Sequence, residues 1–205
     1  MAICFLYFDL GKVLVHFDHR QMIRQISDLV GLEAGRVRQV LFEDHLQADY
    51  ECGRLSREGF YEAFCQRTGT RPDAEDFDRA ASDFFDLNLE IVPLVAALQQ
   101  AKYRMGVLSN TCPGHWELCA RRFRLIAEAF PVQALSYKLG AAKPHPEMFR
   151  KAAELAGVAP GEIFFVDDAA ANVEGARAAG FDAVVYLSAG QLADELRARG
   201  LRFNY

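Results

Sequence analysis

The sequence lacks any apolar run of the roughly 18 residues that a membrane-spanning helix requires. Its first ten residues, Met1 to Leu10, also lack the basic segment and the small-residue cleavage site of a secretory signal peptide. We therefore expect a protein that is neither inserted into a membrane nor exported, and that is located in the cytoplasm.

Paired cysteines and long basic runs are missing as well. The five cysteines include no Cys-x-x-Cys pair, which argues against a disulfide framework or a zinc site and suits a reducing compartment. There are 23 Lys and Arg against 28 Asp and Glu, a formal net charge of −5, and the longest basic run is Arg121-Arg122 followed by Arg124. Such a chain is not expected to bind nucleic acid. Its oligomeric state is left open.

What the sequence does contain is alternating strand and helix patterns in a chain of 205 residues, 51% of them hydrophobic. The expected strands are Ala2 to Phe8, Arg104 to Leu108, Phe130 to Leu135, Glu162 to Val166 and Asp182 to Leu187. The expected helices between the later strands are Trp116 to Ala127, Pro146 to Ala156, Asn172 to Ala179 and Gln191 to Arg199. This alternation predicts an α/β fold with a parallel, doubly wound sheet.

A long interval after the first strand, from about His16 to about Leu87, shows helical patterns and no convincing strand. Its expected helices are Gln21 to Val30, Glu33 to Asp44, Ser56 to Thr68 and Asp73 to Phe85. We interpret the interval as a four-helix insertion that covers the sheet edge. The expected division is a core made of residues 1–16 and 88–205 and an inserted domain made of residues 17–87.

Polar side chains stand where the expected strands end. They are Asp9, Ser109-Asn110-Thr111, Lys143 and the pair Asp167-Asp168. Because the carboxyl ends of parallel strands meet at one edge, where ligands bind in open α/β sheets, these groups are expected to converge. Carboxylates, a hydroxyl and an ammonium together suit a phosphate bound with a divalent cation, and hard oxygen ligands favour Mg²⁺.

These residue types fit a phosphoryl transfer through Asp9. A carboxylate about 4 Å from one phosphate charge is repelled by roughly 4 kcal/mol at an effective dielectric near 20, so Mg²⁺ shared by Asp9 and Asp168, with Lys143 on the phosphate, is needed to reverse that repulsion. The Ser109 hydroxyl and the backbone amides of Leu10 and Asn110 are further candidate phosphate donors. Lys138 is the alternative to Lys143, but the KPHPEMF context favours Lys143.

The segments FDLGKVL, VLSNT, AKPHPEMF and FFVDDAAANVEGARAAG resemble the four ordered motifs of the haloacid dehalogenase-like superfamily. The resemblance covers essentially the whole chain. It implies a Rossmann-like core, an inserted helical-bundle cap, an aspartyl-phosphate formed on Asp9, and Mg²⁺ held by Asp9, the Gly11 carbonyl and Asp168. Asp167 is expected to hold Lys143 or a metal-bound water. Within the superfamily the chain is similar to a bacterial phosphatase of α-D-glucose 1-phosphate, whose first motif also reads DLG. The resemblance implies that the partner is a small phosphorylated metabolite, above all a sugar 1-phosphate.

The sequence departs from the family pattern at Gly11, where most phosphatases of the family carry an aspartate that acts as general acid and base. Such catalysis contributes roughly 10²- to 10⁴-fold. One interpretation is that the leaving group needs little protonation, as with an anomeric hydroxyl or an acyl phosphate, or that a neighbour such as His16, Asp18 or His19 replaces the acid.

Two other interpretations remain open. The site could bind phosphoryl ligands with little turnover and act as a sensor or scaffold. Alternatively, the chain could be a metal-independent 2-haloacid dehalogenase, since those enzymes use the same aspartate and also lack the second one. Asp167 and Asp168 argue against a dehalogenase, because they would repel a carboxylate substrate in a metal-free site.

Overall fold

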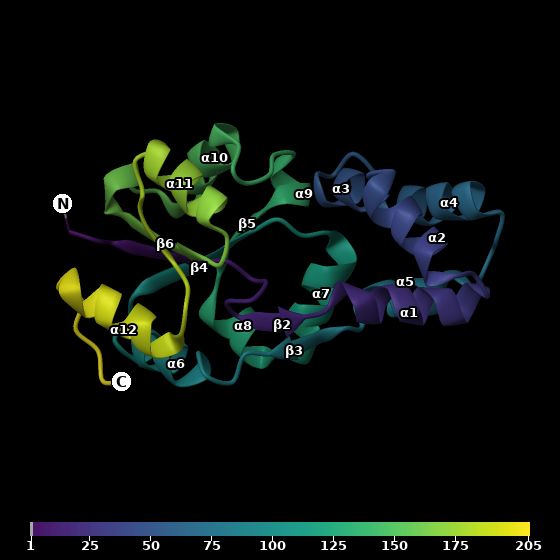
Figure 1. Ribbon diagram of the computed structural model, residues 1–205. Coiled ribbons are helices and arrows are strands. Elements are labelled where there is room, and N and C mark those ends of the chain that lie inside the picture. The colour runs from purple at the N-terminus through teal and green to yellow at the C-terminus, as the bar shows by residue number, and fades with distance from the viewer. Residues whose placement is uncertain (1) are drawn as a thin grey trace.

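The computed structural model describes residues 2–205 (Figure 1). Its main sheet has five strands in the order β5-β4-β1-β6-β7, and all neighbouring strands run parallel. The strands are β1 (Phe5–Phe8), β4 (Arg104–Ser109), β5 (Val132–Leu135), β6 (Ile163–Asp167) and β7 (Asp182–Val185). Each lies within or beside an expected strand, and the predicted parallel sheet is confirmed.

Strand β1 lies in the centre of the sheet because it is apolar on both faces. All four of its residues are buried. Phe5 and Tyr7 pack into the core on one face, and Leu6 and Phe8 pack into the core on the other. Asp9 is the first polar residue after this strand, so the chain reaches the sheet edge with a carboxylate in the middle of it.

Helices cover both faces of the sheet (Figure 1). On the face of Phe5 and Tyr7 they are α10 (Pro146–Ala156) and α11 (Ala170–Ala178). On the face of Leu6 and Phe8 they include α6 (Val92–Gln100), α7 (Pro113–Arg122), α8 (Arg124–Ala129) and α12 (Ala189–Ala198). Short helices α9 (Ser136–Leu139) and η2 (Pro160–Glu162) lie between the core elements.

The inserted segment forms a group of helices beyond one end of the main sheet, at the right of Figure 1. Its helices are α1 (His19–Val30), α2 (Ala34–Arg38), the π-helix η1 (Gln39–Glu43), α3 (Leu46–Glu51), α4 (Arg57–Thr68) and α5 (Ala74–Ser82). The antiparallel strands β2 (Val15–Phe17) and β3 (Phe85–Leu87) enclose this segment in the sequence, so the chain enters and leaves it side by side.

Several elements differ from the expectation. Strands β2 and β3 occur although the sequence indicates no strand there, because three residues are too few to show an alternating pattern. The expected helix from Glu33 to Asp44 divides into α2 and η1, and α3 follows unpredicted. The expected helix from Trp116 to Ala127 breaks at Phe123, whose backbone is extended (φ −117°, ψ 94°). Helices α6 and α9 are also additional.

One contact between the insertion and the core lies at the end of α3, and another joins α5 to α7. Ser136, the first residue of α9, accepts a hydrogen bond from the Thr111 amide (2.9 Å), and its hydroxyl lies 2.5 Å from the carbonyl of Glu51. Gly53 has φ +71°, and a Cβ added there would lie 2.4 Å from the Tyr137 carbonyl oxygen. This approach therefore requires glycine. Across residues 2–205, every helix is too short or too polar to traverse a lipid bilayer.

Candidate active site

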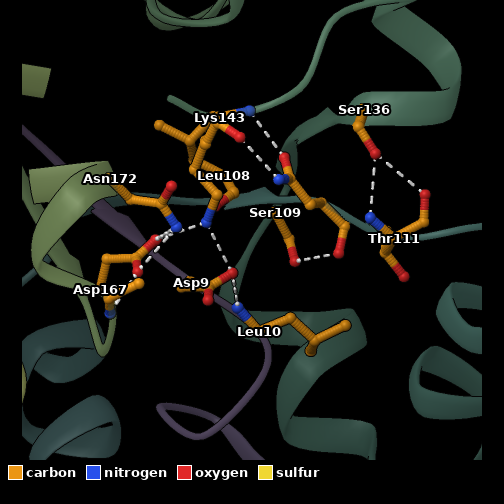
Figure 2. Close-up of polar contacts among 11 residues, drawn as sticks. Asp9, Leu10, Leu108, Ser109, Thr111, Ser136, Lys143, Asp167 and Asn172 are labelled. Carbon is orange, nitrogen blue, oxygen red and sulfur yellow. Dashed lines mark hydrogen bonds and ion pairs between the residues drawn. The ribbon is translucent and has the colours of Figure 1, made fainter. Parts of the chain in front are cut away.

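The ends of three adjacent strands and one loop bring the predicted polar residues together (Figure 2). Asp9 follows β1, Ser109 ends β4 and Asp167 ends β6, while Lys143 comes from the loop before α10. All four are buried, with at most 7% of their surface exposed. Buried charges of both signs are stable at such a sheet edge only when they lie close enough to form ion pairs.

The Lys143 ammonium makes those pairs. It lies 2.9 Å from Asp9 Oδ1 and 2.6 Å from Asp167 Oδ2, and it also donates to the Leu108 carbonyl at 2.9 Å. These three acceptors match the three N–H donors of an ammonium, which fixes its orientation. Lys138, the alternative, instead donates to Gln133 at the surface.

The Asn110 side chain holds the Lys143 loop in place. Its Oδ1 accepts from the Lys143 amide (2.8 Å) and its Nδ2 donates to the Lys143 carbonyl (2.9 Å). The sequence pointed to the Asn110 backbone amide and missed this side-chain function, for which one sequence offers no signal. The Ser109 hydroxyl has a long contact of 3.4 Å with the Asn110 carbonyl, so it can turn to a ligand at little cost.

Burial is the largest influence on the charge of Asp9 and raises its pKa to about 6. The Lys143 ammonium opposes this effect, and Asp167 adds to it. Burial also disfavours the charged form of Lys143, but Asp9 and Asp167 outweigh it and leave the pKa of Lys143 raised. The Asp9 carboxylate is therefore a stronger base than an ordinary aspartate. Its Oδ1 also accepts from the Leu10 amide at 2.7 Å.

Asp167 and Asp168 are adjacent in sequence but have different surroundings. Asp167 accepts from Lys143, from the Ala169 amide (2.8 Å) and from Asn172 Nδ2 (3.0 and 3.1 Å). The Asp168 side chain is 27% exposed, and its Oδ2 lies 3.1 Å from the Lys12 ammonium. The Asp167 carboxylate is thus fixed by hydrogen bonds within the protein, whereas the Asp168 carboxylate pairs with a solvent-accessible lysine.

The carboxylates of Asp9, Asp167 and Asp168 form a potential cation site. One oxygen from each lies within 4.8 Å of the others. Three hard oxygen donors at a buried edge suit Mg²⁺, which prefers carboxylates and water and needs no nitrogen or sulfur ligand. The donor set therefore fits the predicted metal, and the backbone places the Gly11 carbonyl in the turn directly after Asp9.

The place of the missing aspartate is filled by an aromatic ring. A Cβ added to Gly11 would lie 2.6 Å from Cε1 of Phe17. The Phe17 ring also lies 4.9 Å from the His19 ring, centroid to centroid. Of the suggested replacements, His16 is exposed and Asp18 caps α1 by accepting from the Arg20 amide. Burial lowers the pKa of His19, so less of this ring carries the proton that a general acid must donate at neutral pH.

A cavity of about 350 Å³ lies between α3, α4 and α5 of the insertion and α7 of the core. Its polar lining includes Gln47, Tyr50, Arg57 and Asp78, beside Cys112 from the loop that follows Ser109. The hydroxyl of Tyr50 is buried without a hydrogen-bond partner. The cavity is thus bordered by polar residues of the insertion and by Cys112, three residues after Ser109.

Comparison with known proteins agrees with this geometry. The family model described as haloacid dehalogenase-like hydrolase matches residues 6–180. The D-ribitol-5-phosphate phosphatase of Bacteroides thetaiotaomicron is 28% identical over 184 residues, which are 85% of this chain and 87% of that protein.

Solved structures give the same picture. A haloacid dehalogenase family enzyme from Bacteroides thetaiotaomicron, solved in complex with magnesium and inorganic phosphate, superimposes with a TM-score of 0.81 at 26% identity, covering 91% of this chain and 96% of that one. A HAD-like family hydrolase from Porphyromonas gingivalis gives a TM-score of 0.83 at 26% identity, covering 96% and 99%.

Proposed function

Because the chain belongs to the haloacid dehalogenase-like hydrolase family, we propose that it is a Mg²⁺-dependent phosphatase that hydrolyses a small phosphorylated metabolite. The observation that carries the proposal is the buried Lys143 ammonium, 2.9 Å from Asp9 and 2.6 Å from Asp167, next to a third carboxylate. The phosphatase relative and the related structure with magnesium and phosphate support the same chemistry.

In this proposal Asp9 is the nucleophile. Its carboxylate attacks phosphorus and forms an aspartyl-phosphate, while the bond from phosphorus to the leaving oxygen breaks and that oxygen takes a proton from water. A second water then attacks phosphorus, the bond between phosphorus and the Asp9 oxygen breaks to restore the carboxylate, and the proton of this water passes to the solvent. Lys143, the Ser109 hydroxyl and the amides of Leu10 and Asn110 orient the phosphoryl oxygens and stabilise their charge.

Asp9, the Gly11 carbonyl and Asp168 are the proposed Mg²⁺ ligands. Asp167 is placed to hold Lys143 directly and the metal through water, since its oxygens already accept several hydrogen bonds. The bound ion would neutralise the charge that Asp9 and a phosphate dianion bring to the same place.

We propose sugar phosphates as the substrate class, and sugar 1-phosphates as the preferred members. An anomeric oxygen is a better leaving group than an ordinary alcohol, which suits a site where Phe17 occupies the place of a general acid. In this proposal the sugar lies in the cavity of the insertion, which Cys112, three residues after Ser109, borders on the side of the core. Residues 17–87 would then be a cap that encloses the substrate against the core formed by residues 1–16 and 88–205.

The test is release of phosphate from sugar 1-phosphates, other sugar and polyol phosphates, acyl phosphates and p-nitrophenyl phosphate, with Mg²⁺ and with EDTA. Release should require the metal and should be lost in Asp9→Asn. Asp194→Asn, at a carboxylate that is 81% exposed on α12, is the matched control and should retain activity.

The filled space beside Gly11 favours one second candidate, a phosphoryl-ligand sensor with little turnover. In that case inorganic phosphate and Mg²⁺ would raise the melting temperature, but no substrate would release phosphate. Halide release from 2-haloacids without metal would instead identify a dehalogenase.

A further inference from the structure

Lys12 carries a charge that the proposed reaction does not use. Its ammonium lies 3.1 Å from Oδ2 of Asp168, and its side chain is 60% exposed. Asp168 is the most exposed of the three clustered carboxylates. A lysine is therefore already bound to the carboxylate that a metal ion would reach first from solvent.

The backbone of Lys12 is unusual for a residue with a side chain. Its φ is +58°, in the left-handed region. Its amide donates to the Val15 carbonyl at 2.6 Å, and the amides of Leu14 and Val15 both donate to the Leu10 carbonyl. This closed turn, followed by the buried residues Val13 to Val15, fixes the backbone of Lys12 beside Asp168, while the exposed side chain can still change its position.

The charges of the cluster indicate the role of the contact between Lys12 and Asp168. The cluster contains three carboxylates, Asp9, Asp167 and Asp168, and two ammoniums, Lys143 and Lys12, so that −3 and +2 leave −1. Lys143 uses its three donors on Asp9, Asp167 and the Leu108 carbonyl. Lys12 is therefore the cation that balances Asp168, and its exposure leaves it free to move.

We propose that Lys12 is a tethered counter-ion of Asp168 that Mg²⁺ must displace, and that the displaced ammonium then binds the phosphoryl group. The inference rests on the proposed function. Lys12 lowers the affinity for Mg²⁺ when no phosphate is present, because it competes with the metal for Asp168. It strengthens the coupling between metal and phosphate, because the ammonium that the metal displaces from Asp168 then binds the phosphate. Lys12 is in this sense a positioning residue for the metal and a binding residue for the phosphate.

The test is calorimetric titration of Mg²⁺ into wild type, Lys12→Met, Lys12→Gly and Lys12→Arg, with and without inorganic phosphate. An exposed or half-exposed ion pair changes a binding constant by about two- to five-fold. We expect Lys12→Met and Lys12→Gly to bind Mg²⁺ tighter by that factor without phosphate, and Lys12→Arg to resemble wild type. Glycine also suits the left-handed backbone, so Lys12→Gly protects the test against misfolding.

The second readout is the ratio of the Mg²⁺ dissociation constants without and with phosphate. Linkage requires the same ratio for phosphate with and without Mg²⁺. This ratio should fall in Lys12→Met and Lys12→Gly, because the ammonium that would reach the phosphate is absent.

Lys102→Met is the matched control. Lys102 is also exposed with a left-handed backbone (φ +62°), but it precedes β4 at the opposite end of the strand from Ser109. Equal Mg²⁺ affinities in Lys12→Met and Lys102→Met, weaker Mg²⁺ binding in Lys12→Met, or an unchanged coupling ratio would overturn the inference. Such a result leaves the proposed function intact if phosphate release still requires Mg²⁺ and Asp9. If neither wild type nor any variant binds Mg²⁺, both this inference and the proposed function are overturned.

Discussion

At the scale of single residues, the site keeps charged side chains in the protein interior, where burial disfavours the charged form. Lys143 binds Asp9, Asp167 and a carbonyl at once, and Asp167 in turn is held by Asn172 and a backbone amide. These side chains are therefore in position before any ligand binds. The free-energy cost of burying their charges is offset by the stability of the rest of the fold.

Asp9 should make stability depend on pH. Burial raises its pKa from 3.8 to about 6, so the folded protein binds this proton more tightly than the unfolded chain. Its contribution to stability is present at low pH and is lost as pH rises from about 4 through about 6.

We therefore expect Asp9→Asn to become more stable relative to wild type as pH rises through this window. Urea unfolding in EDTA at pH 4.5 and pH 7 measures the difference. Asp194→Asn should show no such trend, and parallel pH profiles for wild type and Asp9→Asn would contradict the prediction.

Gly11 and Phe17 should be changed together to restore an acid. Gly11→Asp alone places its Cβ 2.6 Å from the Phe17 ring, so we expect lower stability and no gain in rate. Gly11→Asp with Phe17→Ala opens the space. Its hydrolysis of alkyl phosphates should then rise about ten-fold or more relative to p-nitrophenyl phosphate, whose leaving group needs no proton.

The measurement is the ratio of kcat/KM for the two substrates, and Phe17→Ala alone is the control. A double variant with the same ratio as Phe17→Ala would show that residue 11 does not face the leaving group.

At the scale of elements, the contact between α3 and α9 is one of the places where the insertion packs on the core. Gly53 and Gly69 both have left-handed backbones, with φ +71° and +72°, but only Gly53 meets a neighbouring carbonyl. Gly69→Ala should cost about 1 kcal/mol for the backbone alone. Gly53→Ala should cost about 2–4 kcal/mol because the contact with Tyr137 must also open.

Thermal or urea unfolding of the two variants gives the comparison. Because the backbone strain is nearly the same, the difference isolates the contact between insertion and core. Equal losses of stability would show that α3 and α9 adjust to a methyl group freely.

The elements also show what a single sequence can predict. The sheet strands and α10 carry strong signals, since runs such as Phe5–Phe8 are apolar throughout and α10 begins at a proline and ends before Gly157. The convergence of Asp9, Lys143 and Asp167 could be predicted from the parallel order of the strands. Strands β2 and β3 could not be predicted, because each has only three residues. The position of the Phe17 ring beside Gly11 could not be predicted either, because it depends on a tertiary contact.

At the scale of the whole molecule, metal binding should stabilise the fold. A ligand at a hundred times its dissociation constant adds about 2.7 kcal/mol to the free energy of unfolding, which in a domain of this size raises Tm by about 5–10 °C. We expect Mg²⁺ to raise Tm by this amount relative to EDTA in wild type and by little in Asp168→Asn. Differential scanning fluorimetry measures both, with Asp194→Asn as the control; an equal shift in Asp168→Asn would place the metal elsewhere.

The central place of β1 has a consequence for synthesis of the chain. Residues 5–8 are made before the other strands of the sheet, but their neighbours in that sheet are residues 104–109 and 163–166. An apolar strand therefore leaves the ribosome about a hundred residues before a partner for either of its edges exists. Such long-range pairing is slow and exposes the chain to aggregation. Asp9 meets Asp167 only after β6 has been translated, so a nascent chain remains inactive until more than four-fifths of these 205 residues have been made.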